Sequence, residues 1–162
     1  MPNPEWKPQR LPDFSYTGPY AYFVTLCLQN RSALFGQVIP LHEGAGVRLK
    51  GPGQMASLWL SKLEEKYPGV TLVESVVMPD HVHLVLQDAG SETDLRRMMQ
   101  WFKTQTTNAY IRKVREGVFP PFEGHLWQRS YYEHIIRNEE DLRGTCEYVQ
   151  NNPLRWILKH NR

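Results

Sequence analysis

His81 and His83 are separated by a single residue within the largely apolar run 76–86. Alternate side chains of a β-strand share a face, so both imidazoles would point the same way. The opposite face of the strand is then entirely apolar and consists of Val82, Leu84 and Leu86. Neutral imidazole binds divalent metal ions well, and two histidines on one strand face can hold one ion. The alternative is a pair of surface or hydrogen-bonded histidines that hold no metal.

Tyr148 is a second residue whose side chain could take part in a reaction, and it lies in a helix expected near the C-terminus. The core-facing stripe of that helix consists of Leu142, Cys146 and Val149. At about 100° per residue Tyr148 falls to one side of this stripe, and Asn152 projects beside it one turn later. The phenol and carboxamide can therefore reach a neighbouring site. The alternative is a half-buried aromatic residue at 148 and a C-terminal cap at 152.

Together these groups suit phosphodiester chemistry. Two imidazoles and one amide oxygen can hold Mg²⁺ or Mn²⁺, which polarises a phosphate oxygen and stabilises charge on a leaving group. A tyrosine oxygen can attack phosphorus and form a covalent phosphotyrosine. The pKa of a free phenol is about 10, so the metal or a nearby base must assist its deprotonation. The covalent link conserves bond energy, which allows rejoining without ATP.

Hydrophobic spacing and turn residues predict the elements that position these groups. Strands are expected over 20–29, 70–78, 81–87 and near 131–136. Helices are expected over 55–66 and about 93–114, with Ser91 as the N-cap of the second. A last helix begins after the cap residue Asn138 and ends at Asn152-Pro153. Residues 30–53 form a loop that can hold a short ribbon.

This order predicts an α+β fold, a ferredoxin-like βαββαβ antiparallel sheet with both crossover helices on one face. The other face is open to a ligand or to the C-terminal helix that carries Tyr148. The 162 residues suit a single domain, preceded over 1–19 by a proline-rich extended arm. Neither a signal peptide nor a membrane span is expected, so we predict a cytoplasmic protein. Cys27 and Cys146 are expected to be small buried hydrophobes without a disulfide.

The distribution of charge is more informative than the net charge of +2. Six basic and no acidic residues occur from Arg96 to Arg115, and the tail after Pro153 is also basic. Such segregation permits a positive groove for nucleic acid. The alternative is an ordinary solvated helix face.

Four stretches of the chain resemble the REP-associated tyrosine transposases, members of the HUH single-strand endonuclease superfamily. They are Phe23–Leu26 with the loop Asn30–Gly36, the strand Val77–His83, the segment Trp127–Arg137, and the segment Glu147–Leu154. HUH stands for His, hydrophobic, His, which matches the motif in the second stretch. The order and spacing of all four are far more specific than the histidine motif.

The resemblance implies that His81 and His83 are metal ligands and that Tyr148 is the nucleophile. Asn152 falls where relatives present a third, amide-type ligand, although Asn151 is adjacent. His134 lies in a matching segment, where it would orient a ligand, contact DNA or be a partly exposed strand residue. Tyr131 and Tyr132 are chemically rival nucleophiles, and the resemblance ranks them below the tyrosine of the last helix.

Family members cut single-stranded DNA near palindromes that form hairpins. The resemblance therefore implies a metal-dependent endonuclease and transesterase in transposition or REP-element mobilisation, nucleoid-associated, and either a monomer or a homodimer. Candidate DNA contacts are Arg96, Arg97, Lys103, Arg112, Lys113, Trp127, Arg129, His134 and Arg155. Trp127 is equally suited to the core. The alternatives are a non-cleaving hairpin-binding regulator and other metal-dependent phosphodiester chemistry, including RNA processing.

Overall fold

The computed structural model of the chain describes residues 21–89 and 94–160. The predicted arm over 1–19 and the predicted cap at Ser91 lie outside these residues. The strands are β1 (Ala21–Cys27), β2 (Gly36–Pro40), β3 (Ala45–Leu49), β4 (Val70–Val77), β5 (His81–Asp88) and β6 (Tyr132–Ile136). The helices are η1 (Gln29–Arg31), α1 (Gly51–Ser61), α2 (Leu63–Lys66), α3 (Leu95–Arg115), α4 (Glu139–Gln150) and α5 (Asn152–His160).

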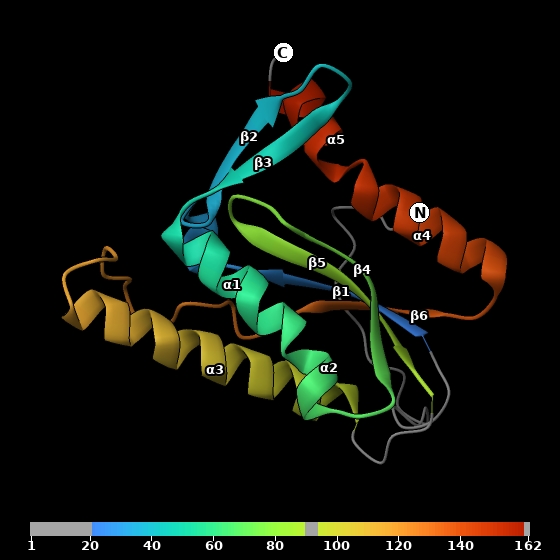
Figure 1. Cartoon of the computed structure of the whole chain (residues 1–162), viewed down its shortest axis with the longest axis horizontal. Helices are drawn as coiled ribbons and strands as arrows, with labels where there is room; N and C mark the ends of the chain where they lie inside the picture. Colours follow the sequence, from blue (N-terminus) through green and yellow to red (C-terminus); the bar gives the residue numbers. More distant parts are fainter. Residues whose placement is uncertain (1–20, 90–93, 161–162) are drawn as a thin grey trace.

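The central sheet has the strand order β4-β5-β1-β6, and every neighbouring pair is antiparallel. Helices α1 and α3 cover one face of the sheet, and α4 crosses the other (Figure 1). The predicted α+β class, the βαββαβ order and the C-terminal helix are thereby confirmed. None of the helices within the described ranges combines the length and apolar character that a membrane span requires.

Strict alternation along β5 separates two hydrophobic clusters. Val82 and Leu84 belong to the larger cluster beneath α1 and α3, whereas Val85 belongs to the smaller cluster beneath α4. His81 and His83 share the face of Val85, as the period of two predicts. The histidine pair is therefore buried under the helix that carries Tyr148.

The predicted boundaries need several corrections. The loop over 30–53 contains the expected ribbon, formed by the antiparallel strands β2 and β3. The helix predicted over 55–66 instead begins at Gly51 and is divided into α1 and α2. Asp94 is the N-cap of α3, where its side chain accepts a hydrogen bond from the Arg97 amide. Both cysteines are free, but they are only partly buried.

The largest difference is α5, which replaces the tail expected after Pro153. Helix α4 ends at Gln150, before the predicted end at Asn152-Pro153, and the chain then starts a new helix at Asn152. Pro153 lies in the first turn of α5, where its missing amide hydrogen costs nothing because such amides have no partner within the helix. The helix packs against the ribbon β2–β3.

Candidate functional site

The two imidazoles of β5 face each other through their Nε2 atoms, which are 3.1 Å apart. The Nδ1 atom of His81 is 2.6 Å from Oδ1 of Asp80, and Nδ1 of His83 is 2.7 Å from the hydroxyl of Thr25. Each ring thus has an oxygen partner at Nδ1. Where that nitrogen carries the proton, the lone pair lies on Nε2, toward the other ring.

Burial lowers the pKa of His83 well below its usual value, and the charges of His81 and Arg31 lower it further. A hydrogen bond with the side chain of Asn152 acts in the opposite direction. Because burial dominates, His83 is neutral near pH 7, and the neutral form is the one that binds metal.

Tyr148 and Asn152 both lie at this pair, although Asn152 begins α5 and does not continue the helix of Tyr148 as predicted. The ring of Tyr148 is centred 5.7 Å from that of His83 and 5.9 Å from that of Phe23. The guanidinium of Arg155 lies 5.0 Å from the Tyr148 ring centre. Tyr148 and Asn152 are both buried, and the alternative of a C-terminal cap at Asn152 is wrong, because Asn151 is the C-cap of α4.

The rival tyrosines are placed less favourably. Tyr131 packs against the cluster beneath α1 and α3, across the sheet from the histidine pair. Tyr132 shares the face of the pair, but burial, Tyr148 and Asp141 raise its pKa to about 12. A phenol that resists ionisation is a poorer nucleophile, so Tyr132 is disfavoured on electrostatic grounds.

The donor set fits a hard divalent cation. Two nitrogens about 2.1 Å from one ion, at adjacent octahedral positions, are about 3 Å apart, which is the spacing of the histidine pair. Within the described residues no third His, Cys, Asp or Glu completes a cluster with them. An amide oxygen such as that of Asn152, together with water, would supply the remaining ligands for Mg²⁺ or Mn²⁺.

Sequence inspection missed three residues that surround the pair. Asp80 and Thr25 hold the Nδ1 atoms, and Trp156 of α5 lies with its ring centred 6.2 Å from that of His81. Asp80 had a signal, since it directly precedes the histidine motif in the sequence. Thr25 and Trp156 become neighbours only through sheet register and through the unexpected α5.

The predicted DNA contacts divide between the two faces of the sheet. Four of the predicted contacts are exposed on α3, namely Arg96, Arg97, Arg112 and Lys113. Helix α3 covers the face opposite α4, so the sheet separates these cations from the histidine pair (Figure 1). Arg155 lies at Tyr148, and His134 of β6 is 2.9 Å from Oδ2 of Asp141 on α4.

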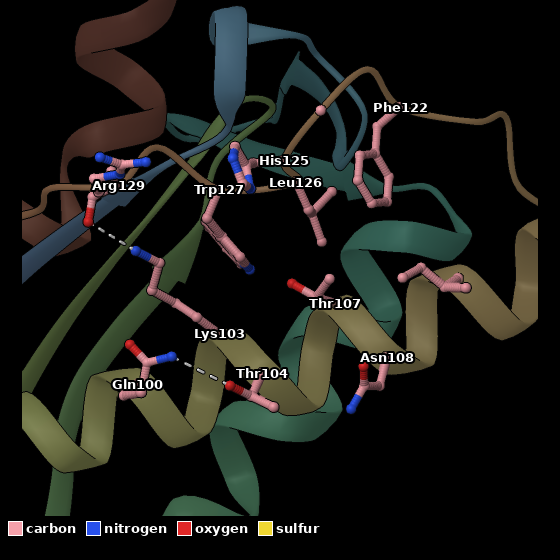
Figure 2. A pocket seen from close by; sticks show the side chains of 12 residues that line it. Gln100, Lys103, Thr104, Thr107, Asn108, Phe122, His125, Leu126, Trp127 and Arg129 are labelled. Atoms are coloured by element: carbon pink, nitrogen blue, oxygen red, sulfur yellow. Dashed lines mark hydrogen bonds between the residues drawn. The ribbon is translucent and has the colours of Figure 1, made fainter.

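Three further candidates line a hollow of about 410 Å³ between α3 and the segment before β6 (Figure 2). Lys103 donates to the carbonyls of Gln128 at 2.8 Å and Arg129 at 3.1 Å. Trp127 is 4% exposed, and its Nε1 donates to the Thr106 hydroxyl at 2.8 Å, so it belongs to the core. Arg129 is exposed, and none of the described residues that line the hollow is acidic.

Comparisons with known proteins agree with this fold. A family model described as "Transposase IS200 like" matches residues 55–152. An uncharacterized protein of Haemophilus influenzae is 30% identical over 161 residues, which cover 91% of this chain and 87% of that protein. A REP-associated tyrosine transposase of Escherichia coli is 29% identical over 84 residues, covering 51% of this chain and 44% of that protein.

A solved structure of a REP-associated tyrosine transposase bound to a REP hairpin is similar in fold. Its TM-score is 0.64 at 22% identity, and the match covers 91% of this chain and 74% of that one. The family model spans more than half of the 162 residues and includes the histidine pair and Tyr148. The chain therefore belongs to the IS200-like transposase family, which confirms the resemblance that its four stretches show to REP-associated tyrosine transposases.

Proposed function

We propose that this chain is a metal-dependent single-stranded DNA endonuclease and transesterase that uses Tyr148 as its nucleophile. The observation that carries the proposal is the meeting of the two Nε2 atoms with the Tyr148 ring, 5.7 Å from the His83 ring. These groups come from β5 and α4 of one chain, which is what a site complete within one protomer requires.

The chemistry follows from the side chains present. Mg²⁺ or Mn²⁺, bound by His81, His83 and Asn152, would polarise a phosphate oxygen and stabilise the leaving group. The Tyr148 oxygen forms a bond to phosphorus as the phenol loses its proton, and the bond to the 3′ oxygen of the preceding nucleotide breaks. That oxygen leaves as a 3′ hydroxyl, and the 5′ phosphate stays on Tyr148. The reverse reaction rejoins strands.

We infer that the DNA substrate is a palindromic hairpin with a single-stranded foot. This inference is supported by the relative whose structure holds a REP hairpin and by the family of the chain. Arg129 is the exposed arginine at the hollow, and Arg155 is the exposed arginine at Tyr148. They would contact phosphates. A substrate of this kind implies association with the nucleoid.

The test uses hairpin DNA with a single-stranded flank, labelled in separate samples at its 3′ or its 5′ end, and incubated with the full chain and Mn²⁺. A denaturing gel should show a covalent adduct that carries only the 3′ label, because the downstream fragment bears the 5′ phosphate. Tyr148→Phe should lose the adduct, and Tyr132→Phe should keep it.

Chelation with EDTA should also abolish the adduct. Retained hairpin binding without cutting or adduct, across metals and sequences, would identify a non-cleaving regulator instead. Cleavage restricted to RNA would assign the site to RNA processing, and an adduct that survives in Tyr148→Phe would assign the attack to another residue.

A further inference from the structure

We propose that Arg31 and Asp80 form a relay that positions His81 for metal binding, an inference that rests on the proposed function. Arg31 belongs to the stretch Asn30–Gly36, which the resemblance singles out and for which the proposed chemistry has no use. Its side chain contacts Asp80, which is 49 positions later in the sequence, in the turn before the histidine motif.

The relay consists of one carboxylate between two nitrogen donors. Nε of Arg31 donates to Oδ2 of Asp80 at 3.0 Å, and Nη2 donates to Oδ1 at 3.3 Å. The same Oδ1 is 2.6 Å from Nδ1 of His81. The Asp80 side chain is only 10% exposed, so this two-pronged contact holds a nearly buried carboxylate in one orientation.

The backbone around Arg31 aims the guanidinium at that turn. Asn30 and Arg31 have φ values of 59° and 51°, in the left-handed region that residues other than glycine seldom adopt. Unusual backbone conformations persist where surrounding contacts determine them, and they gather at functional sites. Here the Arg31 amide donates to the Leu28 carbonyl at 3.0 Å, and Nη1 donates to Sγ of Cys27 at 3.0 Å.

The loop and the turn are also joined through their main chains. The Leu28 amide donates to the Asp80 carbonyl at 2.9 Å, and the Phe35 amide donates to the Pro79 carbonyl at 3.0 Å. These two bonds, on either side of Arg31 in the sequence, therefore fix the position of the turn relative to the loop that follows β1. The guanidinium then fixes the side chain of Asp80.

The chemical consequence concerns which nitrogen of His81 is free. A carboxylate that accepts the Nδ1 proton leaves the lone pair on Nε2 and makes that nitrogen a better ligand. The partner of His83 is the neutral hydroxyl of Thr25. His81 is thus the ligand with a charged partner. Nη2 of Arg31 is also 3.5 Å from Nδ1 of His81, a longer contact than either of its bonds to Asp80, so the carboxylate is the main link between the two.

The test measures Mn²⁺ binding to the full chain without DNA, by electron paramagnetic resonance. Loss of a group that orients a metal ligand typically weakens binding 10- to 100-fold. We expect a loss of about that size for Asp80→Asn and about 10-fold for Arg31→Gln. Arg31→Gln introduced into Asp80→Asn should have no additional effect, because the relay passes through the carboxylate.

A second readout follows the His81 ring itself in the metal-free protein. Nitrogen-15 NMR should show a shift in the ring tautomer in both single variants, which general loss of stability would not produce. Arg48→Gln, an exposed arginine on β3, is the matched control and should resemble the parent in both measurements. Circular dichroism identifies the variants that fold.

Parent-like Mn²⁺ affinity and tautomer in folded Arg31→Gln and Asp80→Asn would overturn the relay. An equal effect of Arg31→Gln with and without the Asp80 carboxylate would overturn it as well. In those cases His81→Ala would still abolish binding, and the proposed metal site would stand. Parent-like Mn²⁺ binding by His81→Ala would instead overturn both the relay and the metal-dependent function.

Discussion

The side chain of Gln150, two residues after Tyr148, donates a hydrogen bond to Glu74 of β4 at 2.8 Å. Near the other end of α4, Asp141 is 2.9 Å from His134 of β6. Strands β4 and β6 are the two edges of the central sheet, so these two contacts hold α4 across the full width of the sheet. Tyr148 lies between these two fastenings, which fixes its ring over β5.

We predict that Glu74→Ala slows adduct formation about 10-fold while the affinity for hairpin DNA changes little. The lost hydrogen bond is exposed and contributes about 0.5–1 kcal/mol to the free energy of unfolding, but small displacements of a nucleophile are costly in rate. Single-turnover kinetics and denaturant unfolding measure the two effects. Glu65→Ala on α2 is the exposed control. Parent-like rates in both Glu74→Ala and Gln150→Ala would contradict this role for the C-terminal fastening.

Two adjacent asparagines compete for the role of third ligand, and their surroundings favour Asn152. It is 8% exposed and hydrogen-bonded to His83, whereas Asn151 is exposed at the end of α4. We predict that Asn152→Ala weakens Mn²⁺ binding, by less than His81→Ala does. Asn151→Ala should match the parent in calorimetric titration, and the reverse ranking of the two asparagines would assign the ligand to Asn151.

Substitutions of Trp127 and Arg129 should have different effects: the first should lower stability, and the second should weaken DNA binding. Trp127→Ala removes a buried ring and its bond to Thr106, so we expect a loss of about 3–5 kcal/mol in unfolding free energy. Arg129→Ala should leave stability unchanged, weaken hairpin binding, and reduce the slope of log affinity against log salt by about 1. Thermal melts and binding at several salt concentrations test both. Weaker binding by fully folded Trp127→Phe would restore a nucleotide-stacking role for the tryptophan.

Periodic features of the chain were predictable because local geometry determines them. The period of two in β5 correctly separated the histidines from Val82, Leu84 and Leu86. In α3, Leu95, Met98 and Phe102 recur at helical spacing and are buried in the core. The same reasoning placed Tyr148 and Asn152 one turn apart, and the structure brings both to His83.

Features that depend on distant contacts were not predictable. Arg31 meets Asp80 only because the backbone at Asn30 and Arg31 adopts left-handed geometry, which no periodicity signals. Helix α5 was missed because a proline after a helix normally marks an end, whereas Pro153 also suits a first helical turn. The basic run on α3 is visible in the sequence, but only the sheet topology shows that it lies on the opposite face of the sheet from the histidine pair.

The depressed pKa of His83 predicts how the stability of the metal-free protein depends on pH. Burial lowers this pKa in the folded state, while in the unfolded chain it returns to about 6.5. Below that value the unfolded state binds a proton that the folded state resists. The contribution of His83 to stability is therefore complete above about pH 6.5 and declines as the pH falls, by at most about 1.4 kcal/mol per pH unit.

His83→Gln removes this titration while keeping a polar side chain of similar reach. Denaturant unfolding from pH 7.5 to 5 should show the free energy of unfolding falling more steeply in the parent than in the variant. Titrating groups away from the pair contribute equally to both proteins, so the difference between the two curves reports His83 together with its coupled neighbour His81. Parallel curves would mean that the folded protein accepts the proton readily and that the imidazole is not held neutral by burial.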